Sequence, residues 1–267
     1  MPTVPPFVDA AFLTAHPHAV LADVRSSPAD RGEGARRYAE SHLPGAVFVD
    51  LDRWLAAPPS PAEGRHPLPD PEVFAEGMRA AGIGDDALVV AYDDEANAFA
   101  ARLVWMLRVT GHEAALLDGG ITGWTGPLTT EVPVVHPASF TARPWPAAEL
   151  AGLADLDDAL LLDARPAGRF RGENETLDVR AGHVPGAVNL PCRENVGPDG
   201  FLLPDDVLRE RFAVVDRPWV SSCGSGVTAC QNLLVAEHLG LPRGRLWPGS
   251  WSQWAATDRP AELGSPR

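Results

Sequence analysis

The amino-acid sequence predicts an α/β protein with two tandem domains, each a parallel sheet flanked by helices on both faces. Three observations support this fold class: the chain length, an internal repeat, and the alternation of short apolar runs with helical stretches. The 267 residues are enough for two domains that each bury a core. Strands that alternate with helices are typical of parallel sheets covered on both faces.

Four short motifs occur twice, in the same order, in the two halves of the chain. The pairs are Asp23–Arg25 with Asp163–Arg165, His42–Val47 with His183–Val188, Leu88–Asp93 with Pro218–Cys223, and Gly119–Trp124 with Gly249–Trp254. Ordered self-similarity of this kind indicates a tandem duplication. We therefore expect an N-terminal domain over residues 1–127 and a C-terminal domain over 147–267, joined by a proline-rich extended linker over 128–146.

Within each half, the apolar runs predict strands and the longer amphipathic stretches predict helices. The expected strands are Val20–Val24, Val47–Asp50, Leu88–Tyr92 and Ala115–Leu117 in the first half, and Leu160–Ala164, Val188–Leu190, Trp219–Ser222 and Arg245–Trp247 in the second. The expected helices are Phe74–Ala81, Ala98–Thr110, Asp205–Phe212 and Thr228–Leu239. In sheets of this type, ligands bind at the carboxyl ends of the strands.

Composition excludes several classes of function. The net charge is −14, which argues against nucleic acid or an anionic membrane surface as the main partner. The N-terminus shows no secretory signal, and no window approaches the roughly 18 apolar residues of a membrane helix. Three cysteines in a chain of this length do not form a disulfide framework, so we expect a reducing, cytoplasmic location.

The most informative stretch is Val220–Ala229, where an expected strand ends in a cysteine and a loop of small residues leads into a helix. Cys223 would lie among main-chain N–H groups at the positive end of that helix, which favours a nucleophilic thiolate. A buried structural cysteine is the alternative, and we prefer it for Cys192 and Cys230. Residues 224–242 contain no Arg or Lys, which argues against phosphatase chemistry.

The loop Cys-Gly-Ser-Gly-Val-Thr after a strand resembles the active-site loop of the rhodanese superfamily, specifically its mercaptopyruvate sulfurtransferase type. The resemblance covers nearly the whole chain and implies the same two-domain fold. It implies that Cys223 carries a persulfide, whose terminal sulfur is cradled by loop N–H groups of Gly224, Gly226, Val227 and Thr228. Asp93 stands in the position of Cys223 in the first half, so that copy is expected to be inactive.

The resemblance also assigns roles to residues around the loop. It implies that Ser225 relays a proton, although a helix cap is the alternative. Arg169 corresponds to the arginine that binds the substrate carboxylate, with Arg180 as a second clamp and Arg171 as its rival. His42, with an upstream acid such as Asp30, is implied as the partner of the serine in the relay. His183 lies in the same kind of turn as His42, so a shared structural role is the simpler account for both.

These observations predict a sulfurtransferase that moves sulfur from 3-mercaptopyruvate through Cys223 to a thiol or cyanide. Thiosulfate-type members carry Arg and Lys after the cysteine, whereas this chain has Gly224 and Ser225. This difference favours the mercaptopyruvate type. Thiosulfate sulfurtransferase, with cations supplied from outside the loop by Arg169 and Arg180, is the nearer alternative. A non-catalytic module for partner binding or redox sensing is the more distant one. We expect no metal and no organic cofactor, because neither zinc spacing nor a dinucleotide fingerprint occurs. A thioredoxin-like protein is implied as a possible acceptor.

Overall fold

The computed structural model describes residues 2–157 and 159–264, and these fall into two compact units. Unit 1 contains the chain up to Ala57, then Pro69–Trp145 and Val196–Leu202. Unit 2 contains Pro58–Leu68, Pro146–Asn195 and the chain from Leu203 onward. The units are therefore not contiguous in sequence, because one short segment from each half belongs to the other unit.

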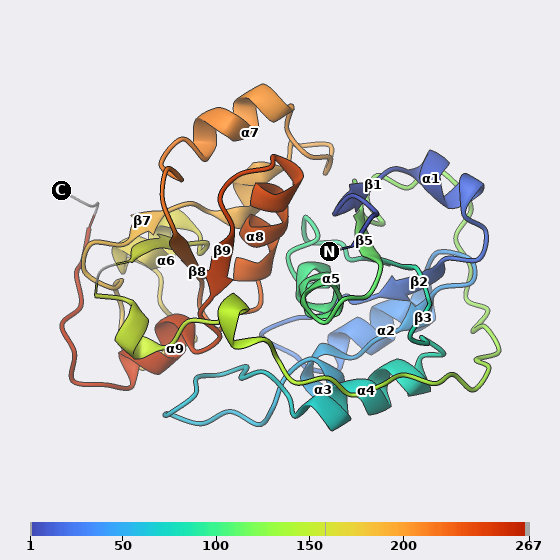
Figure 1. Ribbon diagram of the computed structural model, residues 1–267, viewed down its shortest axis with the longest axis horizontal. Helices are drawn as coiled ribbons and strands as arrows, with labels where there is room; N and C mark the ends of the chain where they lie inside the picture. The colour runs from blue at the N-terminus through green and yellow to red at the C-terminus, as the bar shows by residue number, and fades with distance from the viewer. Residues whose placement is uncertain (1, 158, 265–267) are drawn as a thin grey trace. The chain divides into compact units, whose positions relative to one another are not determined.

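Unit 1 is built on a parallel sheet of five strands in the order β1-β5-β4-β2-β3 (Figure 1). Its strands are β1 (Phe7–Val8), β2 (Val20–Asp23), β3 (Val47–Phe48), β4 (Val89–Tyr92) and β5 (Ala114–Leu117). Its helices are α1 (Ala10–Ala15), α2 (Glu33–Glu40), α3 (Leu51–Trp54), α4 (Pro71–Ala80) and α5 (Ala100–Val109). All four residues of the central strand β4 are buried, as a strand in a parallel sheet requires.

Unit 2 is built on a parallel sheet of four strands in the order β7-β6-β8-β9. Its strands are β6 (Leu160–Asp163), β7 (Val188–Asn189), β8 (Trp219–Ser222) and β9 (Gly244–Leu246). Its α-helices are α6 (Ala167–Arg171), α7 (Asp205–Arg211), α8 (Ala229–His238) and α9 (Ser250–Ala255). Three 3₁₀ turns complete it: η1 (Ala147–Glu149), η2 (Leu153–Asp155) and η3 (Cys192–Asn195). The predicted α/β class is confirmed in both units.

Local sequence explains where several helices begin. Helix α4 starts at Pro71, whose fixed φ suits a first helical position, and Asp70 caps it by accepting a hydrogen bond from Glu72 N at 2.8 Å. Helix α5 starts at Ala100, two residues later than the predicted Ala98; Ala96 and Asn97, just before the predicted start, have φ angles of 61° and 57°. Such left-handed residues cannot continue a helix.

The two sheets hold matching ion pairs at the ends of equivalent strands. Arg25 donates to Asp23 and Arg165 donates to Asp163, each over 2.7 Å between Nη2 and Oδ2. All four side chains are at most 5% exposed. The repeat in the sequence thus reflects a repeated structural device, with a buried bidentate pair that fixes the chain as it leaves β2 and β6.

The linker predicted over 128–146 is extended and is anchored by aromatic side chains. Phe140 is buried and stacks on His112 with ring centroids 4.4 Å apart. Trp145 donates from its indole nitrogen to the Pro69 carbonyl at 2.7 Å. Both contacts lie within unit 1, so the linker is part of that unit as far as Trp145.

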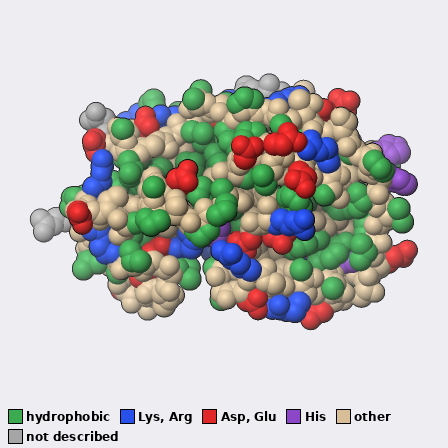
Figure 2. Space-filling model, turned by 90° about the horizontal axis from the view of Figure 1, so that it is seen from below, with side chains coloured by type: hydrophobic (Ala, Val, Ile, Leu, Met, Phe, Trp, Pro, Cys, Tyr) green, Lys and Arg blue, Asp and Glu red, His purple; other side chains and the backbone are tan. Residues whose placement is uncertain are grey.

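Charged side chains of both signs are mixed on the face of the molecule in Figure 2, with hydrophobic side chains scattered among them. The net charge of −14 is therefore not gathered into one acidic patch on that face. Within residues 2–157 and 159–264, no helix is long and apolar enough to cross a membrane.

Candidate active site

The loop from Cys223 to Thr228 connects β8 to α8, which packs against β8 and β9 (Figure 1). The Cys223 sulfur accepts hydrogen bonds from Gly226 N at 3.1 Å and Ser225 N at 3.4 Å. Cys223 itself is only 2% exposed. Two main-chain dipoles at a buried sulfur, at the N-terminal side of a helix, stabilise negative charge there.

Gly226 makes this curl of the loop possible. Its φ angle is +76°, and a Cβ at this position would lie 2.4 Å from the carbonyl oxygen of Pro248. Any other residue would therefore suffer both backbone strain and a clash with main chain. The glycine predicted to belong to the sulfur cradle is thus required by the geometry of the loop.

The first residues of helix α9 form hydrogen bonds with the main chain of Cys223 and Gly224. The carbonyl oxygens of Cys223 and Gly224 accept hydrogen bonds from Trp251 N at 3.0 Å and Ser252 N at 2.9 Å. Ser250 Oγ accepts from Cys223 N at 3.0 Å and donates to the Trp247 carbonyl at 2.8 Å. These contacts fix the first peptides of the loop, so the N–H groups behind them stay directed at the sulfur. Trp247, Trp251 and Trp254 are core residues of unit 2.

Ser225 is 6% exposed and has a histidine partner that the sequence analysis did not identify. His66 Nδ1 lies 2.7 Å from Ser225 Oγ. His66 belongs to the segment Pro58–Leu68, which is part of unit 2 although it lies in the first half of the sequence. The main chain of this segment is tied to α9, because Arg65 N donates to Ser252 Oγ at 2.9 Å.

His42, the histidine proposed from the sequence, has a different environment. Its ring is fully buried in unit 1, with Nδ1 2.7 Å from the Tyr38 carbonyl and Nε2 3.0 Å from the Glu131 carbonyl. His183, its counterpart in the second copy, stacks on Phe170 as His42 stacks on Tyr38. Matching burial and stacking at both positions favour the structural role.

Asp30 was proposed as the acid of the same relay. It forms an exposed ion pair with Arg36, over 2.5 Å between its Oδ2 and Nη2 of the arginine. That pair lowers the pKa of Asp30, because the hydrogen bond from Arg36 stabilises the carboxylate. The histidine that the structure places against Ser225 is His66, so His66 replaces His42 as the candidate partner of the serine.

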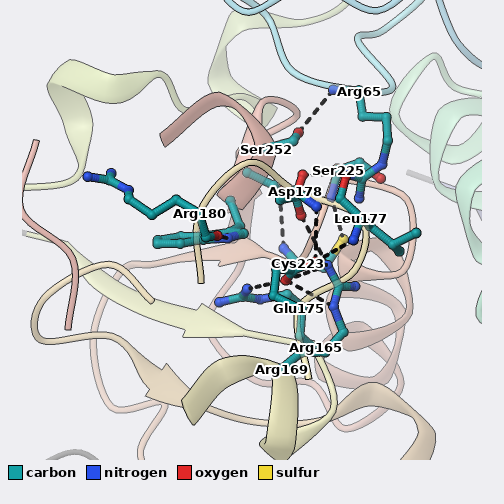
Figure 3. Close-up of polar contacts among 12 residues, drawn as sticks. Arg65, Arg165, Arg169, Glu175, Leu177, Asp178, Arg180, Cys223, Ser225 and Ser252 are labelled. Atoms are coloured by element: carbon teal, nitrogen blue, oxygen red, sulfur yellow. Dashed lines mark hydrogen bonds and ion pairs between the residues drawn. The ribbon is translucent and has the colours of Figure 1, made fainter. Parts of the chain in front are cut away.

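Arg169 lies at the loop as predicted, and Arg180 does not. Arg169 donates to Glu175 at 2.9 Å and to Asp178 at 3.0 Å, and its Nη1 lies 3.3 Å from the point where a Cβ on Gly224 would stand. Arg180 donates to the main-chain carbonyls of Arg259 and Trp254 instead. Figure 3 shows its side chain extending away from Cys223.

The physical reason for the position of Arg180 is a competing aromatic surface. Its guanidinium lies over the Trp251 ring, 5.8 Å from the centroid, and its two Nη atoms donate to main-chain carbonyls away from the loop. Arg171, the rival residue, is partly exposed and pairs with Glu173. Neither arginine is therefore placed to bind a ligand at Cys223.

A second arginine reaches the loop from the segment that carries His66. Arg65 pairs with Asp178, and its Nη2 lies 3.0 Å from the same Cβ point on Gly224. Figure 3 shows its side chain extending from that segment toward the Cys223 sulfur. Arg65 was not among the residues predicted from the sequence.

Two buried charged side chains, Arg165 and Glu175, belong to the surroundings of the loop. Arg165 is 1% exposed, pairs with Asp163 and lies over the Trp251 ring. Burial opposes the charge of Arg165, but Asp163, Glu175 and Cys223 outweigh it and raise its pKa. Burial also opposes the charge of Glu175, yet the N–H of Leu177 and the Arg169 guanidinium hold its pKa below the ordinary value. Arg165 and Glu175 thus both remain charged at neutral pH.

Unit 1 shows what the equivalent loop looks like without a cysteine. The Asp93 carboxylate accepts hydrogen bonds from four main-chain N–H groups, those of Glu95, Asn97, Phe99 and Ala100, at 2.7–2.8 Å. Burial raises the pKa of Asp93 to about 6, although these donors act in the opposite direction. The equivalent cradle in unit 1 is therefore filled by the protein's own carboxylate.

Among the residues the structure describes, no group of three or more His, Cys, Asp or Glu side chains is arranged to hold a metal ion. Cys192, Cys223 and Cys230 are all free and buried. Burial raises the pKa of Cys192 to about 12, so it is inert as a thiolate near neutral pH. Of the three, Cys223 is the candidate nucleophile, because its sulfur accepts hydrogen bonds from two loop N–H groups.

Comparison with known proteins places this geometry in a family. The model of the rhodanese-like domain matches residues 10–127 and 146–257. The "Probable 3-mercaptopyruvate sulfurtransferase" of Pseudomonas aeruginosa is 43% identical over 91% of this chain and 91% of its own. A Mycobacterium tuberculosis protein that carries a thiosulfate sulfurtransferase name is 35% identical over 85% of this chain and 84% of its own. The structure of 3-mercaptopyruvate sulfurtransferase from Leishmania major superposes with a TM-score of 0.85 at 32% identity, covering 97% of this chain and 77% of that one.

Proposed function

Because the chain belongs to the family of proteins with rhodanese-like domains, we propose that it is a sulfurtransferase that takes sulfur from 3-mercaptopyruvate onto Cys223 and passes it to a thiol or to cyanide. One observation carries the proposal. A cysteine sulfur lies in a nest of N–H groups, in a loop without cations of its own, beside a Ser225–His66 hydrogen bond.

The first half-reaction follows from this arrangement. The Cys223 thiolate attacks the sulfur of 3-mercaptopyruvate, and an S–S bond forms as the C–S bond breaks. The electron pair of the broken bond passes to C3 of the donor as an enolate. The proton that leaves the donor thiol ends on C3 and gives pyruvate. Ser225, hydrogen-bonded to His66, is the group proposed to move that proton.

The loop is suited to hold the product of this step. The outer sulfur of the persulfide is anionic, and the N–H groups of Gly224, Gly226, Val227 and Thr228 are proposed to bind it at the start of α8. In the second half-reaction an acceptor thiolate or cyanide attacks this outer sulfur, and the pair of the S–S bond returns to Cys223. A thioredoxin-like protein, with two thiols, is a proposed acceptor.

The substrate carboxylate is proposed to bind Arg169. Its guanidinium is held by Glu175 and Asp178, which are 3% and 4% exposed, and so it is fixed before a ligand arrives. A planar guanidinium matches the two oxygens of a carboxylate. A loop that is itself uncharged, with its cations beside it rather than within it, favours the binding of a 2-oxo acid over that of a sulfur oxyanion.

Thiosulfate sulfurtransferase is the second candidate function. The name of the Mycobacterium tuberculosis relative favours it, as do the arginines near Gly224 that lie outside the loop. Thiosulfate is a compact dianion, and these cations could serve it. Thiosulfate needs more positive charge near Cys223 than 3-mercaptopyruvate does. A cation added to the loop by mutation therefore distinguishes the two candidate functions.

The experiment compares 3-mercaptopyruvate and thiosulfate as donors, with cyanide as acceptor, for the wild type and for Ser225→Lys. We expect the wild type to prefer 3-mercaptopyruvate and the variant to shift toward thiosulfate, because it gains a cation and loses the hydroxyl. A preference of the wild type for thiosulfate would overturn the choice of substrate. Turnover of neither donor would favour a binding or redox-sensing module.

A further inference from the structure

Two guanidinium groups each leave one nitrogen open at the same place on the catalytic loop. A Cβ built on Gly224 would lie 3.0 Å from Arg65 Nη2 and 3.3 Å from Arg169 Nη1. The structure gives neither nitrogen a hydrogen-bond partner among the residues it describes. Gly224 directly follows Cys223, so both open nitrogens adjoin the nucleophile.

One buried carboxylate holds both arginines in place. Asp178, which is 4% exposed, binds Arg65 through Oδ1 and Arg169 through Oδ2, the latter at 3.0 Å. Arg65 Nη1 also donates to the Leu177 carbonyl at 3.3 Å. Each guanidinium is therefore fixed on its far side while its near side stays open, as Figure 3 shows for the contacts of Asp178. Such fixed donors lose little entropy when a ligand binds.

The balance of charges around Arg169 indicates that this arginine alone would not attract an anionic donor. Arg169 faces two carboxylates, Glu175 and Asp178, while Arg165 is engaged by Asp163. With Arg169 alone, the group would carry an excess negative charge and would repel an anionic donor. Arg65 neutralises that excess and adds an open N–H group on the side of the loop.

We propose that Arg65 and Arg169 together form the receptor for the carboxylate of the sulfur donor, with Arg65 as the second clamp that Arg180 does not provide. This inference rests on the proposed function. Both arginines touch the substrate in this account, whereas Asp178 is a positioning residue that holds them. The absence of a side chain at Gly224 keeps the receptor open.

The segment that carries Arg65 is suited to this role. Arg65 N donates to Ser252 Oγ, and the Gln253 amide donates to the Ala62 carbonyl, so the segment is fastened to α9. The next residue, His66, is the partner of Ser225. In this proposal, Arg65 binds the donor carboxylate, and the adjacent His66 hydrogen-bonds the Ser225 hydroxyl that transfers the proton. A donor that fits both has a carboxylate close to the carbon that accepts the proton, as a 2-oxo-3-mercapto acid does.

The first test compares two donors that differ only in the carboxylate: 3-mercaptopyruvate and 1-mercaptopropan-2-one. Arg65→Ala is expected to raise KM for 3-mercaptopyruvate roughly 10- to 100-fold, the range that a charge-assisted hydrogen bond supplies. The same variant is expected to change kcat/KM for the ketone less than about threefold, because no carboxylate is present to lose its partner. Arg65→Lys should restore part of the loss, since it keeps the charge but not the fork.

Arg171→Ala is the matched control, because Arg171 lies on α6 near Arg169 but pairs with the exposed Glu173 instead of Asp178. It should leave both donors unaffected. An equal loss with both donors in Arg65→Ala would assign Arg65 a purely structural role and overturn the proposal. An unchanged KM for 3-mercaptopyruvate would overturn it as well.

A second test does not depend on sulfur transfer. Iodoacetate and iodoacetamide alkylate thiolates and differ in their carboxylate, so their rate ratio at Cys223 measures the attraction of the receptor for an anion. We expect Arg65→Ala to lower this ratio about tenfold, while the iodoacetamide rate stays near that of the wild type. Cys223→Ser gives the background from the other cysteines. A ratio that is unchanged in Arg65→Ala would refute the receptor even if the protein proves to be a sulfurtransferase, and a lowered ratio would support it even if neither donor is turned over.

Discussion

Removal of the His66 imidazole tests the proton-transfer arrangement most sharply. His66 Nδ1 and Ser225 Oγ are 2.7 Å apart, and the hydroxyl is almost fully buried. If the pair acts as a unit, His66→Ala and Ser225→Ala remove the same function. Loss of a general acid–base group costs roughly 100-fold or more in rate. We therefore expect each variant to lower kcat/KM for 3-mercaptopyruvate about 100-fold, or about 2.7 kcal/mol of transition-state stabilisation.

The double variant completes the cycle. Because both substitutions break one arrangement, His66→Ala with Ser225→Ala should be no slower than either single variant by more than about threefold. The assay is steady-state turnover with cyanide as acceptor, together with the iodoacetamide rate at Cys223 to show that the loop is intact. A double variant that is slower by the product of the two single effects would refute the idea that His66 acts through Ser225.

His42→Asn is the matched control for the histidine. The His42 ring is buried between the main-chain carbonyls of Tyr38 and Glu131, so the substitution should lower the melting temperature. It should leave kcat/KM within about twofold of the wild type, because the contacts of this ring are structural. A loss of activity equal to that of His66→Ala, in folded protein, would return His42 to the site.

Three further predictions follow from single contacts. Gly224→Ala should raise KM for 3-mercaptopyruvate severalfold, because the new methyl group meets both arginine nitrogens at 3.0–3.3 Å; an unchanged KM would show that the receptor lies elsewhere. Ser250→Ala should cost about 1–3 kcal/mol in a urea titration, because Cys223 N loses its buried acceptor, and an unchanged midpoint would contradict this. Asp85→Asn should cost about 1 kcal/mol at pH 7, since the N–H and hydroxyl of Thr141 lower the pKa of Asp85 to about 2 and its carboxylate is partly exposed.

The sign of the Asp85 effect fixes its pH dependence. The folded-state pKa of about 2 lies below the ordinary value of 3.8, so the stabilisation is present above about pH 4 and is lost as the pH falls through 2. The difference in unfolding free energy between wild type and Asp85→Asn should therefore shrink as the pH falls below about 4. A difference that grows on acidification would contradict the assignment.

Strands and the catalytic loop could be predicted because their signals are local. Leu160–Asp163 and Trp219–Ser222 are short apolar runs that end in polar residues, and the repeat doubles the information about them. Cys223 could be identified because the glycines and the following helix lie beside it in the sequence. The two-residue strand β1 (Phe7–Val8) was missed, because it gains its partner β5 only through a contact more than 100 residues away.

Arg65 and His66 could not be predicted for a different reason. They lie in the first half of the sequence, yet their segment packs in unit 2, where Arg65 N meets Ser252 across 187 residues. The repeat directed attention to His42, which has a counterpart in His183, whereas His66 belongs to no repeated motif. The only local signal is a pair of polar residues between prolines, Gly64-Arg65-His66-Pro67, in a stretch with little helical potential. Arg180 was expected at the site because it lies near Arg169 in the sequence. The sequence did not show that its guanidinium lies over the Trp251 ring instead.

Sulfur loading of Cys223 tests the central claim most directly. The protein is incubated with 3-mercaptopyruvate without an acceptor, and the intact mass and the Cys223 peptide are measured before and after cyanide. We predict a mass gain of about one sulfur atom on Cys223, removed by cyanide and absent in Cys223→Ser, with one pyruvate released per sulfur bound. A protein that gains no sulfur, or gains it equally in Cys223→Ser, would contradict the account.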